Sequence, residues 1–78
     1  MARRIVQERK IQVSEAAAIL GAAVDDSGEM NEWAVTVSGK DVGAIRYDPR
    51  ARVWLATTGT ESTVGDLAGC LRFVIRRY

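Results

Sequence analysis

Few side chains in this 78-residue chain can do chemistry, because it has no histidine and one cysteine, Cys70. A Ser-His-Asp or Cys-His catalytic set needs an imidazole, and a zinc site of the usual kind needs several His or Cys ligands. A carboxylate pair alone can hydrolyse glycosides, but a domain of this size leaves little room for a ligand cleft of about 300 Å³. We therefore expect no catalytic residues, no metal and no cofactor, and a protein that is not an enzyme.

Acidic residues gather between residues 14 and 32, a segment with no basic residue and a net charge of −5 in a chain whose total is +1. Four carboxylates follow the first predicted helix in a loop: Asp25, Asp26, Glu29 and Glu32. Such a cluster can face a basic groove of a partner protein, or it can be a solvated turn that keeps the chain soluble. The oxygen ligands lack the spacing of a calcium loop. We take these four residues as the candidate partner-binding site.

A second set combines basic and aromatic side chains in the middle of the chain: Arg46, Arg50, Arg52 and Trp54. Cations beside an indole can hold phosphate and stack bases, so this set is a candidate nucleic-acid face. Two arrangements explain the same residues without a ligand. Arg46 can stack on Trp54 as a cross-strand pair worth about 0.5–1 kcal/mol, and an N-terminal arm can cover the face. We prefer these two explanations combined.

A third set lies on the last predicted helix. On a helical wheel Phe73 falls opposite the apolar stripe, with Cys70 on its flank and Arg77 nearby. A large aromatic residue on a polar face is typical of an interface, and antiparallel packing of two copies would bring Cys70 against its symmetry mate. These residues predict a homodimer through Cys70, Phe73 and Arg77, with a Cys70–Cys70 disulfide as one form of it. The alternative is that Cys70 is a small buried apolar residue.

The elements that position these residues follow from the spacing of apolar side chains. Residues 1–13 alternate weakly, which predicts an arm or a fourth strand, and Ser14 is a candidate cap for a helix over 14–24. The period is two over residues 33–57, with two turns, which predicts a three-stranded antiparallel meander. An apolar stripe at helical spacing predicts a helix over 63–78. We expect one α+β domain of two layers, with both helices on one face of the sheet.

The alternation also predicts the register of the meander, provided that both turns have an odd number of residues. One face then carries seven side chains for the helices to cover: Trp33, Val35, Val37, Ile45, Tyr47, Val53 and Leu55. Arg46 and Trp54 face each other on the opposite side of the sheet. The sequence lacks the apolar run of a secretory signal or a membrane span, so we expect a cytoplasmic protein.

Two stretches resemble DNA-binding families. Residues 13–21 resemble the opening helix of excisionase-like helix-turn-helix proteins. The segment where the recognition helix should follow is acidic and interrupted by Gly28, so we reject that motif. Residues 43–48 and 53–56, followed by a helix, resemble the sheet-plus-helix DNA-binding domains of phage integrases. Such domains are usually distinctly basic, whereas this chain is close to neutral.

The layout of the whole chain is similar to that of the small phage-encoded anti-CRISPR proteins that inhibit type I surveillance complexes. The similarity rests on the chain length, the absence of a catalytic set, the acidic patch and a helix suited to dimerisation. It implies an inhibitor in the host cytoplasm that binds a Cas subunit and prevents recruitment of target DNA. The alternatives are a small nucleic-acid-binding phage accessory protein that uses the outer sheet face, and an assembly protein that acts through its own dimer.

Overall fold

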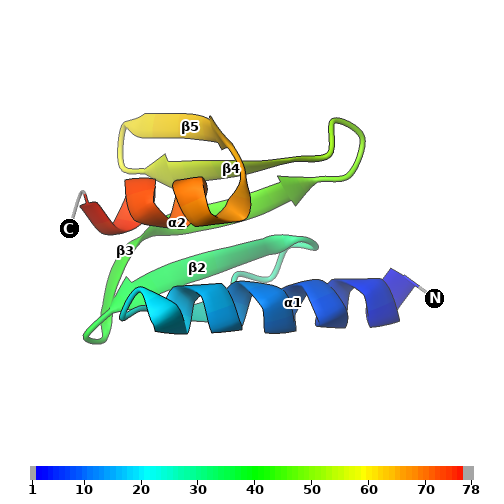
Figure 1. The fold of residues 1–78 in the computed structure, drawn as a ribbon, viewed down its shortest axis with the longest axis horizontal. Coiled ribbons are helices and arrows are strands. Elements are labelled where there is room, and N and C mark those ends of the chain that lie inside the picture. The colour runs from blue at the N-terminus through cyan, green and yellow to red at the C-terminus, as the bar shows by residue number, and fades with distance from the viewer. Residues whose placement is uncertain (1, 77–78) are drawn as a thin grey trace.

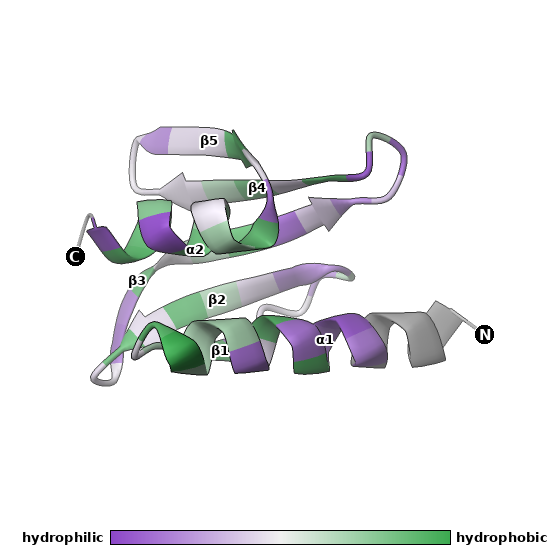
Figure 2. Cartoon of the chain, viewed as in Figure 1, coloured by the Kyte–Doolittle hydropathy of each residue, from purple (hydrophilic) through white to green (hydrophobic). Residues whose placement is uncertain are grey.

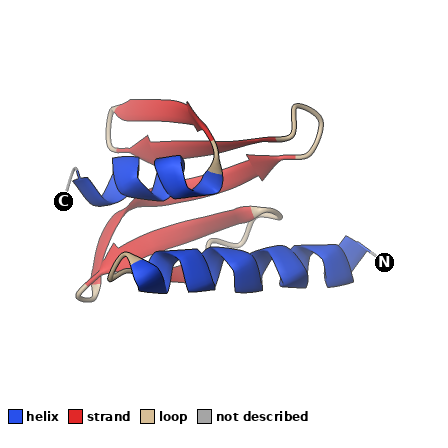
Figure 3. Ribbon diagram, viewed as in Figure 1, coloured by secondary structure: helices blue, strands red, loops and turns tan. Residues whose placement is uncertain are grey.

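The structure, a computed structural model, describes residues 2–76, and over these residues it holds a five-stranded antiparallel sheet and two helices (Figure 1). The elements follow in the order α1 (Ala2–Ile19), β1 (Ala23–Asp26), β2 (Glu32–Val37), β3 (Lys40–Asp48), β4 (Val53–Thr58), β5 (Glu61–Gly65) and α2 (Leu67–Arg76). Each strand pairs with the next one along the chain. Both helices lie on the same face of the sheet (Figure 3). The α+β class is as predicted, with five strands in place of three or four.

Helix α1 replaces the arm or strand predicted over residues 1–13, and it ends earlier than the helix predicted over 14–24. The weak alternation was misleading because the buried side chains follow helical spacing. Val13 and Ala17, one turn apart, are fully buried, whereas Ile11 is 59% exposed. The Arg, Gln, Glu, Lys and Ala residues that fill this stretch are strong helix formers. Ser14 therefore lies inside the helix rather than at its start.

The end of α1 is a Schellman motif built on Gly21, which adopts a left-handed φ of 79°. The Ala22 amide donates to the Ala17 carbonyl at 2.8 Å, and the Gly21 amide donates to the Ala18 carbonyl at 3.0 Å. The chain then runs directly into β1. Residues 23–26 thus form a strand, where the sequence predicts the end of a helix and the start of a loop.

The β2–β3 hairpin keeps the predicted face although its loop has an even number of residues. The loop consists of Ser38 and Gly39, with φ values of 52° and 81°, as in a type I′ turn. A register shift between Val35 and Thr36 then restores the phase. Trp33 consequently pairs with a buried β3 residue on the side of the helices, as predicted.

The phase of β4 is the reverse of the prediction, because four residues, an even number, separate it from β3. Trp54, and not Val53 or Leu55, is therefore buried under the helices. The Trp54 ring lies 5.0 Å from the Tyr47 ring and 6.1 Å from the Trp33 ring, centroid to centroid. The three aromatic residues form one cluster inside the two-layer core.

The helix predicted over 63–78 divides into a strand and a shorter helix. Residues 61–65 form β5, and α2 begins only at Leu67. Asp66 caps the helix, since its Oδ1 accepts a hydrogen bond from the Gly69 amide at 2.8 Å. Val64 thereby leaves the predicted helical stripe and is 60% exposed on β5.

The core lies between the sheet and the helices, and the two helices contribute to it unequally. Helix α2 buries four side chains: Leu67, Cys70, Leu71 and Val74. Over the part of α1 whose side chains are described, only Val13 and Ala17 are buried to the same degree. In Figure 2 the hydrophobic colour of α1 is strongest at the end that leads into β1.

Helix α2 and the sheet are in close contact at Gly43 in β3. A Cβ at this position would lie 2.4 Å from the Thr57 carbonyl oxygen and 2.9 Å from Cγ1 of Val74. Only a residue without a side chain fits there. Gly43 thus lets α2 pack directly against the centre of the sheet.

Candidate functional site

The four predicted partner-binding carboxylates lie on the β1–β2 hairpin, at one edge of the sheet. Asp25 and Asp26 end β1, Glu29 lies in the turn, and Glu32 begins β2. Neighbouring residues of a strand point to opposite faces, so Asp26 lies on the side of the helices and Asp25 on the other side. The structure therefore brings the four together along one edge but divides them between two faces. We call residues 25–32 the acidic hairpin.

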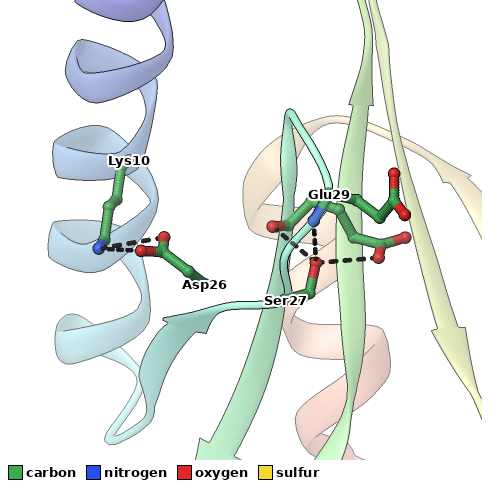
Figure 4. A network of polar contacts seen from close by, with 5 residues as sticks. Lys10, Asp26, Ser27 and Glu29 are labelled. Atoms are coloured by element: carbon green, nitrogen blue, oxygen red, sulfur yellow. Dashed lines mark hydrogen bonds and ion pairs between the residues drawn. The ribbon is translucent and has the colours of Figure 1, made fainter.

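Part of the charge of the acidic hairpin is neutralised within the chain. Nζ of Lys10, on α1, lies 3.1 Å from Oδ1 of Asp26, with both side chains partly exposed (Figure 4). No ion pair joins Asp25 or Glu29 to another residue of the described chain. The unbalanced charge is therefore concentrated at the end of β1 and in the turn.

Ser27 organises the turn through its hydroxyl group. Its Oγ donates toward the Glu32 carboxylate at 3.0 Å and toward the Glu32 carbonyl at 3.1 Å. The same oxygen accepts a longer hydrogen bond, 3.4 Å, from the Glu29 amide (Figure 4). The hydroxyl group thus links the two ends of the turn.

The acidic hairpin is also held from outside, at Asn31. Asn31 has a left-handed φ of 61°, and its Oδ1 accepts a hydrogen bond from Nη1 of Arg9 at 2.6 Å. Its carbonyl accepts another from the Tyr47 amide at 2.9 Å. The Arg9 guanidinium in turn lies 4.1 Å from the centroid of the Tyr47 ring. Helix α1 and strand β3 thus both contact the acidic hairpin at Asn31.

Sequence reasoning missed Arg9 and Asn31. Asn is among the residues that tolerate a left-handed conformation, so Asn31 carried a signal for a special turn position. Nothing local to Arg9 connects it with a turn twenty-two residues away. That contact depends on the placement of α1 across the edge of the sheet.

Met30 lies at the tip of the acidic hairpin and is 68% exposed. A methionine side chain is flexible and polarisable, and methionine is enriched at protein interfaces. Glu29 is its exposed neighbour. The hairpin therefore offers an apolar tip flanked by carboxylate charge.

The structure separates the residues of the predicted nucleic-acid face. Trp54 is 8% exposed and faces the helices, whereas Arg46 is exposed on the opposite side of the sheet. Arg50 and Arg52 lie in the turn between β3 and β4. The predicted Arg46–Trp54 pair is wrong, because the reversed phase of β4 places Trp54 against Tyr47. An N-terminal arm over the outer face is wrong too, since that segment is α1 on the other side.

The residues of the predicted dimer interface are placed differently from the prediction. Cys70 is 1% exposed in the core, as in the alternative, and Phe73 is half-buried against the edge of the core. Arg77 lies outside the described residues. A bridge between two Cys70 residues would require α2 to leave the sheet. The homodimer itself stays a prediction.

The environment of Cys70 also suppresses its reactivity. Burial raises the pKa of the thiol and the Asp66 carboxylate raises it further, while a hydrogen bond with the Gly65 backbone partly opposes both effects. The thiolate is the nucleophilic form of cysteine. At neutral pH the folded protein therefore holds Cys70 as an unreactive thiol.

Two open grooves flank α2. One, of about 610 Å³, lies between β5 and the outer side of α2 and includes Arg72, Phe73 and Arg76. The other, of about 760 Å³, lies between α1 and the start of α2 and includes Arg9 and Arg52. Each groove has a larger volume than the ligand cleft of about 300 Å³ for which we expected little room in a chain of this size. Among the described side chains no three His, Cys, Asp or Glu residues gather to hold a metal ion.

Comparison with protein-family models gives no match for this chain. Comparison with curated proteins gives none. Comparison with solved structures gives none. Neither helix in residues 2–76 has the length and apolar character needed to cross a membrane. A function must therefore be proposed from the geometry of the acidic hairpin and of the grooves beside α2.

Proposed function

We propose that this protein is a non-enzymatic, protein-binding inhibitor of the anti-CRISPR type. It binds a Cas subunit of a type I surveillance complex through the acidic hairpin and blocks the recruitment of target DNA. The observation that supports the proposal most is that the acidic hairpin, contacted at Asn31 by Arg9 and Tyr47, presents Asp25, Glu29 and Met30 to solvent.

A fixed loop is suited to binding because little conformational entropy is lost when a partner orders it. Arg9 and Tyr47 hold the acidic hairpin at Asn31, and Ser27 closes its turn. The contacts support a role for the hairpin in recognition.

The charge of the acidic hairpin indicates the kind of surface that it fits. A protein surface that recruits DNA carries Lys and Arg side chains, since phosphate contacts supply most of its affinity. The carboxylates of Asp25 and Glu29 can pair with the same cations. A protein bound in this way excludes DNA by occupying the cations that the phosphates need.

The test uses a purified type I surveillance complex and a labelled target duplex in a gel-shift assay. Wild-type protein should prevent the shift when it is added in excess of the complex. The variants Asp25→Lys and Glu29→Lys should each raise the concentration needed by about tenfold or more, since charge reversal adds repulsion. Glu15→Lys, which makes the same charge change on the exposed side of α1, is the matched control.

The outcomes separate the parts of the proposal. If the wild-type protein binds no subunit of the complexes tested and DNA binding is unaffected, the assignment as an inhibitor is wrong. If it inhibits and both hairpin variants inhibit equally well, the acidic hairpin is not the binding site. Binding of DNA by the protein alone, falling steeply with salt, would favour the nucleic-acid-binding alternative.

A further inference from the structure

The outer edge of β5 has backbone groups that no strand of the described chain pairs. β5 is the last strand of the sheet, and its register with β4 begins at Glu61 opposite Thr58, across a two-residue loop. Residues that flank such a loop hydrogen-bond to each other, and the pattern alternates along the strand. The N–H and C=O groups of Ser62 and Val64 therefore point away from β4.

This edge has few of the features that usually protect an edge strand, and Glu61 is the one charged residue of β5. β5 contains no lysine and no proline, and both Ser62 and Val64 are exposed. The opposite edge differs, because β1 has only four residues, two of them aspartates, and α1 is joined to it by an ion pair. The β5 edge is therefore the one open to a further strand.

A groove lies between α2 and the last three residues of β5, Thr63, Val64 and Gly65. Helix α2 packs against β5 (Figure 1). The volume of the groove is about 610 Å³, and Gly65 and Gly69 contribute no side chains to it. A Cβ added at Gly65 would meet no atom within 4 Å, so the space beside that residue is free. A chain added to β5 thus has room for side chains on the helix side.

The lining of the groove carries three charged side chains, Arg72, Arg76 and Asp66. The Asp66 carboxylate is engaged at the start of α2, where its Oδ1 accepts a hydrogen bond from the Gly69 amide. The two arginines therefore determine which ligand charge the groove favours. Arg72 and Arg76 are exposed on α2, and neither forms an ion pair with another described residue. They lie one turn apart, about 6 Å along the helix axis, and alternate residues of an extended strand are about 6.6 Å apart. Two carboxylates at positions i and i+2 of an added strand would match this spacing.

We propose that the β5 edge and the adjoining groove of α2 bind an extended acidic segment of a partner protein by strand addition. The main-chain groups of Ser62 and Val64 pair with the backbone of the segment, and Arg72 and Arg76 take its alternate carboxylates. A polypeptide fits better than a single-stranded nucleic acid, because a nucleic acid has no main chain that pairs with a strand edge. The site lies at the opposite edge from the acidic hairpin and does not depend on its proposed role.

A second copy of this chain that packs through its α2 fits the groove less well than an acidic peptide. Antiparallel pairing of two α2 helices would bring Arg72 near Arg72 of the other copy, close to the centre of the interface. Like charges placed opposite each other are unfavourable. The peptide is therefore the occupant to test, and self-association is one outcome of the test.

The probe is a fluorescein-labelled hexapeptide of alternating Glu and Val, titrated with the full chain and followed by fluorescence anisotropy. The first control peptide has Lys in place of each Glu. The second has the same composition as the probe but places three Glu before three Val. The alternating acidic peptide should bind, with NMR amide shifts centred on Ser62 and Val64. Arg72→Gln combined with Arg76→Gln should weaken binding about tenfold or more, while Arg46→Gln combined with Arg50→Gln should leave it unchanged.

The variant Val64→Pro tests strand addition directly. It removes an amide that points away from β4, and an edge strand tolerates proline at such a position. The variant should keep its circular dichroism spectrum and lose the peptide. If it does not fold, the arginine double variant and the shift map decide the question.

Four results of the peptide experiments would overturn the proposal. They are no binding at about 1 mM peptide, equal binding of the three peptides, amide shifts away from β5, and full affinity in the arginine double variant. It would also be wrong if the protein proved to be a dimer with the β5 amides protected from exchange in the absence of peptide, or if oligothymidylate bound in the groove in preference to the peptide.

Discussion

Helices α1 and α2 lie on the same face of the sheet but are held there by different forces. α2 buries four apolar side chains and packs against the centre of the sheet at Gly43. α1 buries two among its described side chains and is joined to the β1 edge by polar contacts from Arg9 and Lys10. α2 therefore contributes the larger part of the described core, while α1 contacts the acidic hairpin.

The largest effect should come from a cavity under α2. Leu71 is fully buried, so Leu71→Ala removes buried methyl groups and should lower the free energy of unfolding by about 3 kcal/mol. Urea denaturation measures this change. Ile11→Ala on α1, where the side chain is mostly exposed, is the control and should cost less than about 1 kcal/mol. Equal losses in the two variants would contradict the comparison.

The next largest effect should come from the contact between β3 and α2. Gly43→Ala would place a Cβ against the Thr57 carbonyl and Val74, and should cost about 2–3 kcal/mol through strain. Gly65→Ala is the matched substitution, since its Cβ meets no atom within 4 Å, and should change stability by less than about 0.5 kcal/mol. Thermal unfolding of both variants measures the difference. A Gly43→Ala protein as stable as the wild type would show that α2 can shift away from the sheet at little cost.

A smaller effect is expected at the polar contacts of α1. Arg9→Gln removes the contact with the Tyr47 ring and the hydrogen bond to Asn31, and should cost about 1 kcal/mol. Its clearer consequence should be faster hydrogen exchange at the amides of Met30 and Asn31. Arg50→Gln, in an exposed turn, is the control. Unchanged exchange in the Arg9 variant would mean that the hairpin is ordered without α1.

The smallest effect should come from the exposed ion pair. Lys10→Gln removes the partner of Asp26, and an exposed pair of this kind contributes about 0.5 kcal/mol or less. The difference from wild type should disappear at about 1 M salt, where the Debye length is about 3 Å. Urea denaturation at low and high salt tests this expectation. A salt-independent loss above about 1 kcal/mol would point to packing of the Lys10 stem.

The elements that sequence alone predicts well are those whose signal is local. The C-terminal part of the chain has a helical apolar stripe, and the pairs Ser38-Gly39 and Asp48-Pro49 mark turns between strands. α1 was mistaken for an arm because its polar residues give no strong stripe and only two of its described side chains are fully buried. Strand β1 was missed because Asp25 and Asp26 have low strand propensity. They are part of a strand because they pair with Ala34 and Trp33 of β2.

The candidate sites were predictable in part. The acidic residues were visible as a cluster, but the contact that fixes Asn31 comes from Arg9, far along the chain. The predicted nucleic-acid face was wrong because the β3–β4 turn has an even number of residues and no register shift follows it, so Trp54 points into the core. Sequence spacing identifies which residues are unusual, whereas the face that each occupies depends on turn lengths and bulges that tertiary packing selects.

The order of the sheet, in which every strand pairs with its neighbour along the chain, has a consequence for synthesis. Each hairpin can close as soon as its second strand leaves the ribosome, because no strand waits for a distant partner. The sheet face formed by these hairpins is apolar. Helix α2, which buries four side chains against it, is synthesised after all five strands. The nascent chain therefore exposes the part of the sheet face that α2 covers until α2 has followed β5 out of the ribosome.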